Sequence, residues 1–241
     1  MNVISLTSVD STNRYLAEEL RHRHLPSGFT VIAEMQTHGR GQTGNSWESE
    51  PAKNLLFSVY FQPIDLPANR LFVVSEMASL CVKYTLDTFI PDVTVKWPND
   101  IYYRDKKIAG ILIENVILGG KVEHSIIGIG ININQVHFLS DAPNPVSLAQ
   151  ITGIIHEKTE VLQTFHKQFM ELSNRLNSNC FDEIHNAYLH DIYRKEGTHK
   201  FRDAEGFFEA TIHNIEPSGH LIFKRLNGRF SRYAFKEVAY L

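Results

Sequence analysis

The sequence predicts an α+β fold that is followed by a small all-β domain. Apolar runs of strand length alternate with helical patterns up to about residue 195, and only short strands with tight turns follow. A length of 241 residues is enough for one large and one small domain, each with its own buried core. We therefore expect a first domain over residues 1–195 and a second over residues 196–241.

The first domain contains predicted strands and helices in an irregular order. N-cap side chains at 10–13 precede a helix, and apolar residues recur at helical spacing from 71 to 89. Two strands rich in Ile and Val flank the hairpin signal Gly119-Gly120. The predicted strands are 3–6, 29–35, 55–61, 93–95, 108–118 and 122–133, and the remaining helices are 147–153, 159–176 and 181–193. The second domain has predicted strands at 199–203, 206–214, 219–225 and 229–235.

Composition excludes several classes of protein. The net charge of -3 is too balanced for a protein whose main task is binding nucleic-acid phosphates. Two cysteines, Cys81 and Cys180, are too few for a disulfide scaffold and indicate a reducing compartment. No apolar run reaches membrane-spanning length, and the first residues lack the features of a signal peptide. We expect a cytoplasmic protein that binds neither DNA nor membranes.

A glycine-rich loop at 39–44 matches the G-x-G-x-x-G pattern. A dinucleotide-binding turn must open a helix, but the next strand begins near residue 54 and leaves no room for one. A phosphate-binding P-loop would need a lysine where Asn45 stands. Both motifs are rejected, and two interpretations remain: a loop that wraps an anion with its backbone and Arg40, or a mobile surface loop.

Two further segments carry residues that are unusual in apolar strands. The KWPND segment at 96–100 ends one strand, and Lys107 enters the next beside a small Ala-Gly pair. A partly buried lysine needs an anion, although a plain β-turn and a lysine that extends to solvent also fit. The GIGININ segment at 128–134 alternates glycine and asparagine with isoleucine. It indicates either a close backbone approach to a ligand or a bulged strand that ends in a turn.

Taken together, these segments resemble the biotin–protein ligase family. The KWPND segment followed by KIAGILIE is the most specific match, and with the small β domain the resemblance covers nearly the whole chain. It implies a mixed-sheet catalytic domain like that of class II aminoacyl-tRNA synthetases, and an SH3-like β-barrel at the C-terminus. The matching segments are Ser11-Thr12-Asn13, Gln36 with 39–47, 96–101, 106–115 and 128–134.

The resemblance implies a reaction in two steps. Biotin and Mg-ATP give biotinyl-adenylate, and a lysine of a biotin carrier domain then attacks it. The cofactors would be ATP and Mg²⁺, with biotin as substrate and the carrier domain of a biotin-dependent carboxylase, such as acetyl-CoA carboxylase, as partner. The oligomeric state stays open. Two alternatives remain: a lipoate– or octanoate–protein ligase, and a biotin sensor without turnover.

The resemblance also implies roles for individual residues. Lys107 would meet the biotin carboxylate and the α-phosphate, Arg40 would close over them, and Trp47 would lie over adenine. The residues expected to bind biotin are Ser11, Thr12, Gln36, Gly39, Arg40, Lys107, Gly110, Gly128 and Gly130. Those expected to bind ATP are Trp47, Lys96, Asn99, Asp100 and Asn132. No histidine spacing predicts a protein-held metal site, so Mg²⁺ would arrive with ATP, near Asp100.

Two departures from the family pattern lead to further expectations. Many bacterial relatives carry an N-terminal DNA-binding domain, whereas this chain begins at the catalytic domain, so we expect a ligase without repressor function. Some members also carry basic residues where Gln42 and Asn45 stand.

We therefore predict that Gln42→Arg slows the release of biotinyl-adenylate. A charge-assisted hydrogen bond is about twice as strong as a neutral one, because the donor carries a full charge. A few-fold to about tenfold slower release corresponds to roughly 1 kcal/mol. Adenylate dissociation is followed after a chase with unlabelled biotin and ATP. An unchanged or faster release of biotinyl-adenylate rejects the charge argument. It would favour either a Gln42 side chain that points to solvent or a phosphate that backbone amides already bind.

Overall fold

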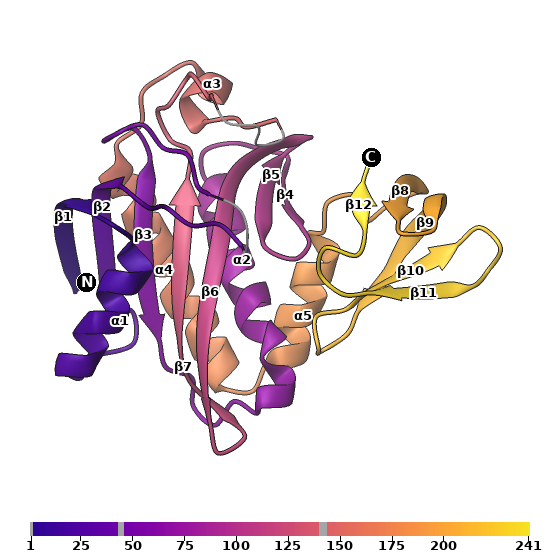
Figure 1. Cartoon of the computed structure of the whole chain (residues 1–241), viewed down its shortest axis with the longest axis horizontal. Coiled ribbons are helices and arrows are strands. Elements are labelled where there is room, and N and C mark those ends of the chain that lie inside the picture. Colours follow the sequence, from indigo (N-terminus) through magenta and orange to yellow (C-terminus); the bar gives the residue numbers. More distant parts are fainter. Residues whose placement is uncertain (1, 43–45, 140–143) are drawn as a thin grey trace.

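The computed structural model describes residues 2–42, 46–139 and 144–241 (Figure 1). Asn45, singled out above, lies outside the described residues. No helix occurs in the described residues between the second and third strands, which agrees with the rejection of both phosphate-binding motifs.

The larger part of the chain forms a seven-stranded mixed sheet with the order β1-β2-β3-β7-β6-β5-β4. β1 and β2 pair in parallel, and every other recorded pair is antiparallel. β5 was not predicted, because its apolar residues directly follow a strong turn signal. The strands are β1 (Val3–Val9), β2 (Thr30–Gln36), β3 (Leu55–Phe61), β4 (Val93–Lys96), β5 (Asp100–Tyr103), β6 (Lys106–Leu118) and β7 (Lys121–Ile131).

Helices cover the two faces of this sheet unequally (Figure 1). α1 (Thr12–His22) packs on β2, β3 and β7, whereas α2 (Phe72–Asp87), α4 (Lys158–Asn177) and α5 (Phe181–His190) form a layer on the other face. The short α3 (Leu148–Thr152) begins at a capping box on Ser147 and ends at Gly153 with φ 78°, as predicted. No described helix is long and apolar enough to cross a membrane. A 3-10 turn, η1 (Ala68–Arg70), precedes α2.

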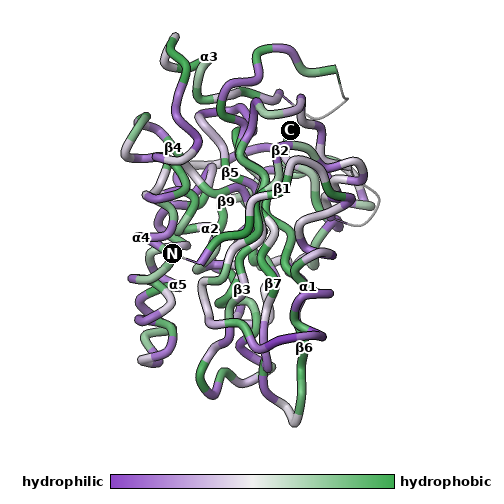
Figure 2. Tube along the Cα trace, turned by 90° about the vertical axis from the view of Figure 1, so that its left-hand side faces the viewer, coloured by the Kyte–Doolittle hydropathy of each residue, from purple (hydrophilic) through white to green (hydrophobic). Residues whose placement is uncertain are grey.

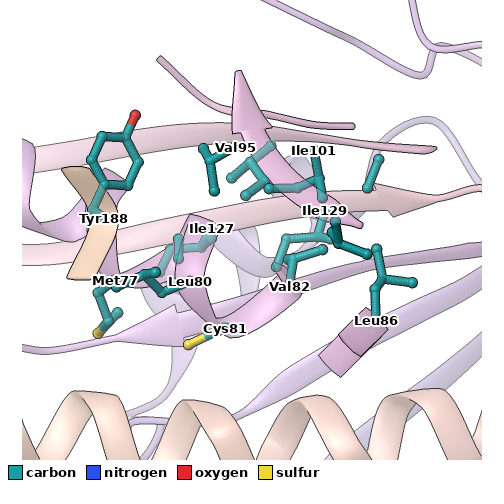
Figure 3. Close-up of a cluster of buried hydrophobic side chains, with 14 of the residues drawn as sticks. Met77, Leu80, Cys81, Val82, Leu86, Val95, Ile101, Ile127, Ile129 and Tyr188 are labelled. Atoms are coloured by element: carbon teal, nitrogen blue, oxygen red, sulfur yellow. The ribbon is translucent and has the colours of Figure 1, made fainter. Parts of the chain in front are cut away.

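The alternation of side chains along β7 sends isoleucines and glycines to opposite faces. Ile127 and Ile129 enter the core with Leu80 and Val82 of α2 (Figure 3). Because successive side chains in a strand point to opposite faces, Gly128 and Gly130 face the side of α1. The apolar character of the central strands is visible along the chain trace (Figure 2). The face covered by α2, α4 and α5 thus carries the main core. On the face of α1, the glycines leave part of the sheet surface uncovered by their own side chains.

The C-terminal part forms a separate five-stranded antiparallel sheet with the order β11-β10-β9-β8-β12. The resemblance led us to expect a small SH3-like β domain here, and this five-stranded antiparallel sheet agrees with that expectation. β12 was not predicted, because two residues are too few to form a recognisable strand pattern. The strands are β8 (His199–Asp203), β9 (Gly206–Ile215), β10 (Leu221–Arg225), β11 (Phe230–Tyr233) and β12 (Ala239–Tyr240).

The small sheet packs against the large domain through the KWPND turn, α2 and α5. The Trp97 indole N–H donates to the carbonyl of Gly219 at 2.9 Å, and its ring lies 6.2 Å from that of Phe235. His185 of α5 contacts Glu76 of α2 at 2.7 Å and Asn214 of β9 at 3.4 Å. Apolar side chains of both sheets belong to one continuous core. A sheet of this size needs such support, because it buries little surface by itself.

We predict that Gly219→Ala loosens this interface and lowers stability more than Gly228→Ala does. Both glycines have positive φ, +86° and +80°, so each alanine costs about 1–2 kcal/mol of backbone strain. A Cβ at residue 219 would also lie 2.6 Å from the Phe72 ring, whereas one at residue 228 meets no heavy atom within 4 Å. This overlap adds about 1–3 kcal/mol. Urea unfolding midpoints measure the difference, and equal losses in both variants would contradict the assigned contact.

Candidate active site

A pocket of about 400 Å³ lies on the glycine side of the large sheet. The start of α1, the glycine loop, the KWPND turn, strands β6 and β7, and residues 235–240 all contribute to its wall. Gly39 and Asn132 are not among its lining residues. The sequence-predicted residues that line it are Ser11, Thr12, Gln36, Arg40, Trp47, Lys96, Asn99, Asp100, Lys107, Gly110, Gly128 and Gly130.

One end of the pocket is a fixed polar network. Gln36 Oε1 accepts hydrogen bonds from the backbone N–H of Thr12 at 2.8 Å and from its hydroxyl at 3.1 Å. The buried Ser58 hydroxyl lies 2.7 Å from Thr12 Oγ1 and 2.6 Å from Asn13 Oδ1, so its single proton serves one of them at a time. Ser11 is the N-cap residue of α1, but its side chain makes no capping hydrogen bond. This end therefore offers donors and acceptors in a dry environment.

Asn13 is a site residue that the sequence analysis did not select. Its amide donates to Glu114 Oε2 at 2.8 Å and to the carbonyl of Leu112 at 3.3 Å. Any Cβ at Gly128 would overlap Asn13 Oδ1. Gly128 therefore makes room for the side chain of Asn13. Both residues line the pocket in which we expected the ligand. Two signals were available: its place in the matching segment Ser11-Thr12-Asn13, and Ser58, a polar residue inside an otherwise apolar strand.

The indole of Trp47 lies across β6 and β7. An added Cβ would come within 2.9 Å of the ring at Gly110 and within 2.6 Å of its nitrogen at Gly130. The backbone N–H of Trp47 donates to the carbonyl of Gly39 at 3.0 Å, which joins the two ends of the glycine loop. The two glycines thus leave room for the Trp47 ring, and both also line the pocket.

Two buried polar atoms of this loop have no hydrogen-bond partner among the described residues: Trp47 Nε1 and Gln42 Oε1. Buried polar atoms in folded proteins are almost always paired. Because Gln42 Oε1 is buried, the interpretation that this side chain points to solvent is disfavoured. Both residues line the pocket, and the described residues supply neither atom with a partner.

The other end of the pocket is cationic. Lys107 Nζ lies 2.6 Å from Asp100 Oδ1 and 5.7 Å from the centre of the Trp47 ring. Burial lowers the pKa of Lys96, and its ammonium donates to the Tyr102 hydroxyl at 3.0 Å. Asp100 is the sole carboxylate among the described lining residues. The positive charge of the lysines therefore exceeds the negative charge, which favours an anionic ligand.

Two predicted asparagines use their amides within the protein. Asn99 donates to the carbonyl of Ile111 and so holds the KWPND turn on β6. Asn132 donates to the carbonyl of Val146 at 3.2 Å, behind the pocket wall, while its Oδ1 is buried without a partner in the described part of the chain. The structure thus places Asn99 at the pocket and Asn132 just outside it.

The C-terminal segment adds a wall that no sequence motif indicated. Its lining residues belong to β12 and to the turn before it, which the small sheet carries to the pocket. They are Phe235, Lys236, Val238, Ala239 and Tyr240.

The chain matches the family model described as the biotin/lipoate A/B protein ligase family over residues 5–132. This match covers more than half of the chain, from β1 to the end of β7. The chain belongs to this family. The match contains both the polar and the cationic ends of the pocket but not the C-terminal wall.

Family members with printed names give more detail. A biotin–[acetyl-CoA-carboxylase] ligase from Paracoccus denitrificans is 30% identical over 93% of this chain and 95% of its own length. The bifunctional ligase/repressor BirA of Salmonella typhimurium is 36% identical over 59% of this chain but only 44% of its own length. The chain thus spans less than half of the bifunctional relatives it matches.

A solved structure of a family member has the same overall fold. The biotin protein ligase from Aquifex aeolicus in complex with biotin and ATP superposes with a TM-score of 0.78 at 27% identity. The superposition covers 99% of this chain and 97% of that one. Both the mixed sheet and the C-terminal sheet therefore have counterparts in a biotin ligase structure.

We predict that Gly130→Ala displaces the Trp47 indole from the sheet. The chain contains two tryptophans, so a Trp97→Phe background leaves Trp47 as the single emitter. The added methyl group overlaps the indole nitrogen, which moves the ring toward water and shifts its fluorescence maximum to longer wavelength. The Trp97→Phe protein with Gly130 retained is the control. An emission maximum that stays in place would contradict the contact.

Proposed function

We propose that this chain is a biotin–protein ligase that forms biotinyl-adenylate and transfers biotin to a lysine of a carrier domain. One observation carries the proposal: a single pocket joins a polar network around Thr12 and Gln36 to a cationic end around Lys107. Such a pocket suits a substrate with a polar head and a carboxylate tail next to a phosphate. The relative named as a biotin–[acetyl-CoA-carboxylase] ligase and the Aquifex complex with biotin and ATP support it.

In the first step, a carboxylate oxygen of biotin attacks the α-phosphorus of ATP. The bond from this phosphorus to the pyrophosphate oxygen breaks, and pyrophosphate leaves. Lys107 would stabilise the negative charge where the carboxylate and α-phosphate meet. Its present partner, Asp100, shows that the ammonium already holds an anion at this point. Catalysis then consists mainly of bringing two anions together and lowering their repulsion.

Mg²⁺ fits this pocket as a companion of ATP. The described residues contain no group of three His, Cys, Asp or Glu side chains that would hold a metal ion. Asp100 lines the pocket at its cationic end and is the side chain that would lie near the metal. The ion would offset charge on the triphosphate.

In the second step, the amine nitrogen of the acceptor lysine attacks the acyl carbon of biotinyl-adenylate. The bond from this carbon to the phosphate oxygen breaks, AMP leaves and the amine releases a proton. No covalent enzyme intermediate is needed. The acceptor would be the carrier domain of a biotin-dependent carboxylase, as the name of the Paracoccus relative suggests.

The remaining roles are those that the family resemblance implies, and they are part of this proposal. Thr12, Gln36 and Ser11 would bind the ureido head of biotin, and Arg40 with Gly39 would close the loop over its chain. Trp47 and Asn99 would contact the nucleotide, with Asn132 supporting the wall behind. We place the domain boundary near residues 195–196, because α5 ends at His190 and β8 begins at His199.

A lipoate or octanoate substrate fits this pocket less well. The aliphatic end of either acid lacks the donors and acceptors of a ureido group. It would add no hydrogen bonds at the polar end of the pocket, where Thr12, Gln36 and Ser58 already bond to one another and a polar head could use their remaining donors and acceptors. Competition by free biotin distinguishes these substrates. A biotin sensor without turnover would release no pyrophosphate.

We predict that Lys107→Ala nearly abolishes biotin-dependent pyrophosphate release. Loss of one charge-stabilising donor costs on the order of 10²–10³ in rate. Lys106→Ala is the matched control, because Lys106 is the exposed neighbour on the same strand and does not line the pocket. Labelling of a carrier domain with biotin and ATP tests the whole reaction. Near-normal pyrophosphate release by folded Lys107→Ala protein would contradict the role of Lys107.

A further inference from the structure

The ammonium of Lys96 lies in an aromatic enclosure. Its Nζ is 4.7 Å from the centre of the Tyr102 ring and 5.0 Å from that of Tyr240, and it donates to the Tyr102 hydroxyl at 3.0 Å. The Tyr193 ring lies behind both, 5.2 Å from Tyr102 and 6.0 Å from Tyr240. A lysine between two aromatic faces is attracted by both rings.

The two sides of the enclosure come from different parts of the fold. Lys96 ends β4 and Tyr102 belongs to β5, a paired hairpin of the large sheet. Tyr240 belongs to β12, where it pairs with Phe201 of β8 and packs its ring edge-on against that residue at 5.2 Å. The small sheet therefore fixes the position of the Tyr240 ring. Both Lys96 and Tyr240 line the pocket.

The charges around Lys96 do not by themselves hold it toward the pocket. Asp100 attracts its ammonium, whereas Lys107 and Arg194 repel it. Asp100 is already engaged by Lys107 at 2.6 Å, and no carboxylate of the described residues lies within ion-pair distance of Lys96. Among the described side chains, its contacts are thus the Tyr102 hydroxyl and the rings of Tyr102 and Tyr240. Without them, a flexible four-carbon side chain would sample other directions.

We propose that Tyr240 is a positioning residue for Lys96: its ring, supplied by the small sheet, holds this ammonium toward the phosphates of ATP. This role rests on the proposed function, because the proposed function assigns ATP to the cationic end of the pocket. It makes the C-terminal sheet part of the nucleotide site. The Tyr240 hydroxyl is buried without a partner among the described residues, so the ring and not the hydroxyl does the positioning.

The test compares ring-free and ring-retaining variants by nucleotide binding. The probe is the α,β-methylene analogue of ATP, titrated calorimetrically with saturating biotin, and it cannot react at the α-phosphorus. Tyr240→Leu should weaken its binding about three- to tenfold, as expected for one cation–π contact. Tyr240→Phe keeps the ring and should bind like the unchanged protein. Tyr240→Met is a second ring-free variant, and Phe230→Leu is an aromatic control on β11 that does not line this pocket.

A double-mutant cycle shows whether Tyr240 acts through Lys96. In a Lys96→Met background, Tyr240→Leu should change binding less than twofold, because the cation is already gone. The proposal is overturned if Tyr240→Leu lowers the affinity for the analogue by the same several-fold factor in that background. It is also overturned if both ring-free variants bind the analogue unchanged, or if Tyr240→Phe weakens binding as much as Tyr240→Leu. If the unchanged protein binds the analogue but forms no adenylate with ATP, only the proposed function fails; if it binds no analogue, both fail.

Discussion

The pleat of β6 and β7 is the constraint on which the rest of this structure depends. The same strands place isoleucines in the core with α2 and glycines under the pocket, because side chains alternate between the two faces of a sheet. The core and the floor of the pocket therefore cannot be altered independently. A one-residue shift in register would bury the glycines and expose the isoleucines.

The open face of this sheet gains its chemistry from the segments around it. The start of α1 brings the polar network, the glycine loop brings Trp47, and the KWPND turn brings Lys96 and Asp100. Each side chain is held by a second contact: Asn13 by Glu114, Asn99 by the carbonyl of Ile111, and Lys107 by Asp100. Such support keeps reacting groups in place without a covalent intermediate, as the proposed ligation requires.

The small C-terminal sheet is coupled to this pocket rather than attached at a distance. Trp97 contacts it through Gly219 and Phe235, and β12 returns from it to the pocket wall. The turn that carries Lys96 and Asp100 is therefore stabilised from both domains. A change in the small sheet is expected to reach the cationic end of the pocket before it reaches the polar network around Gln36.

The sequence by itself determined most of the strands, the main helices and many of the pocket residues. Periodicity, the paired glycines at 119–120 and the KWPND and GIGININ segments are local signals. The family resemblance joined Lys107, Gly110 and Gly130 in one expected site, and all three line the pocket. Only the tertiary structure decided that Asn13 fills the space at Gly128, that Trp47 covers Gly110 and Gly130, and that Tyr240 reaches Lys96. The physical reason is that these contacts join residues far apart in sequence, whereas a sequence pattern reports only on near neighbours along one strand, helix or turn.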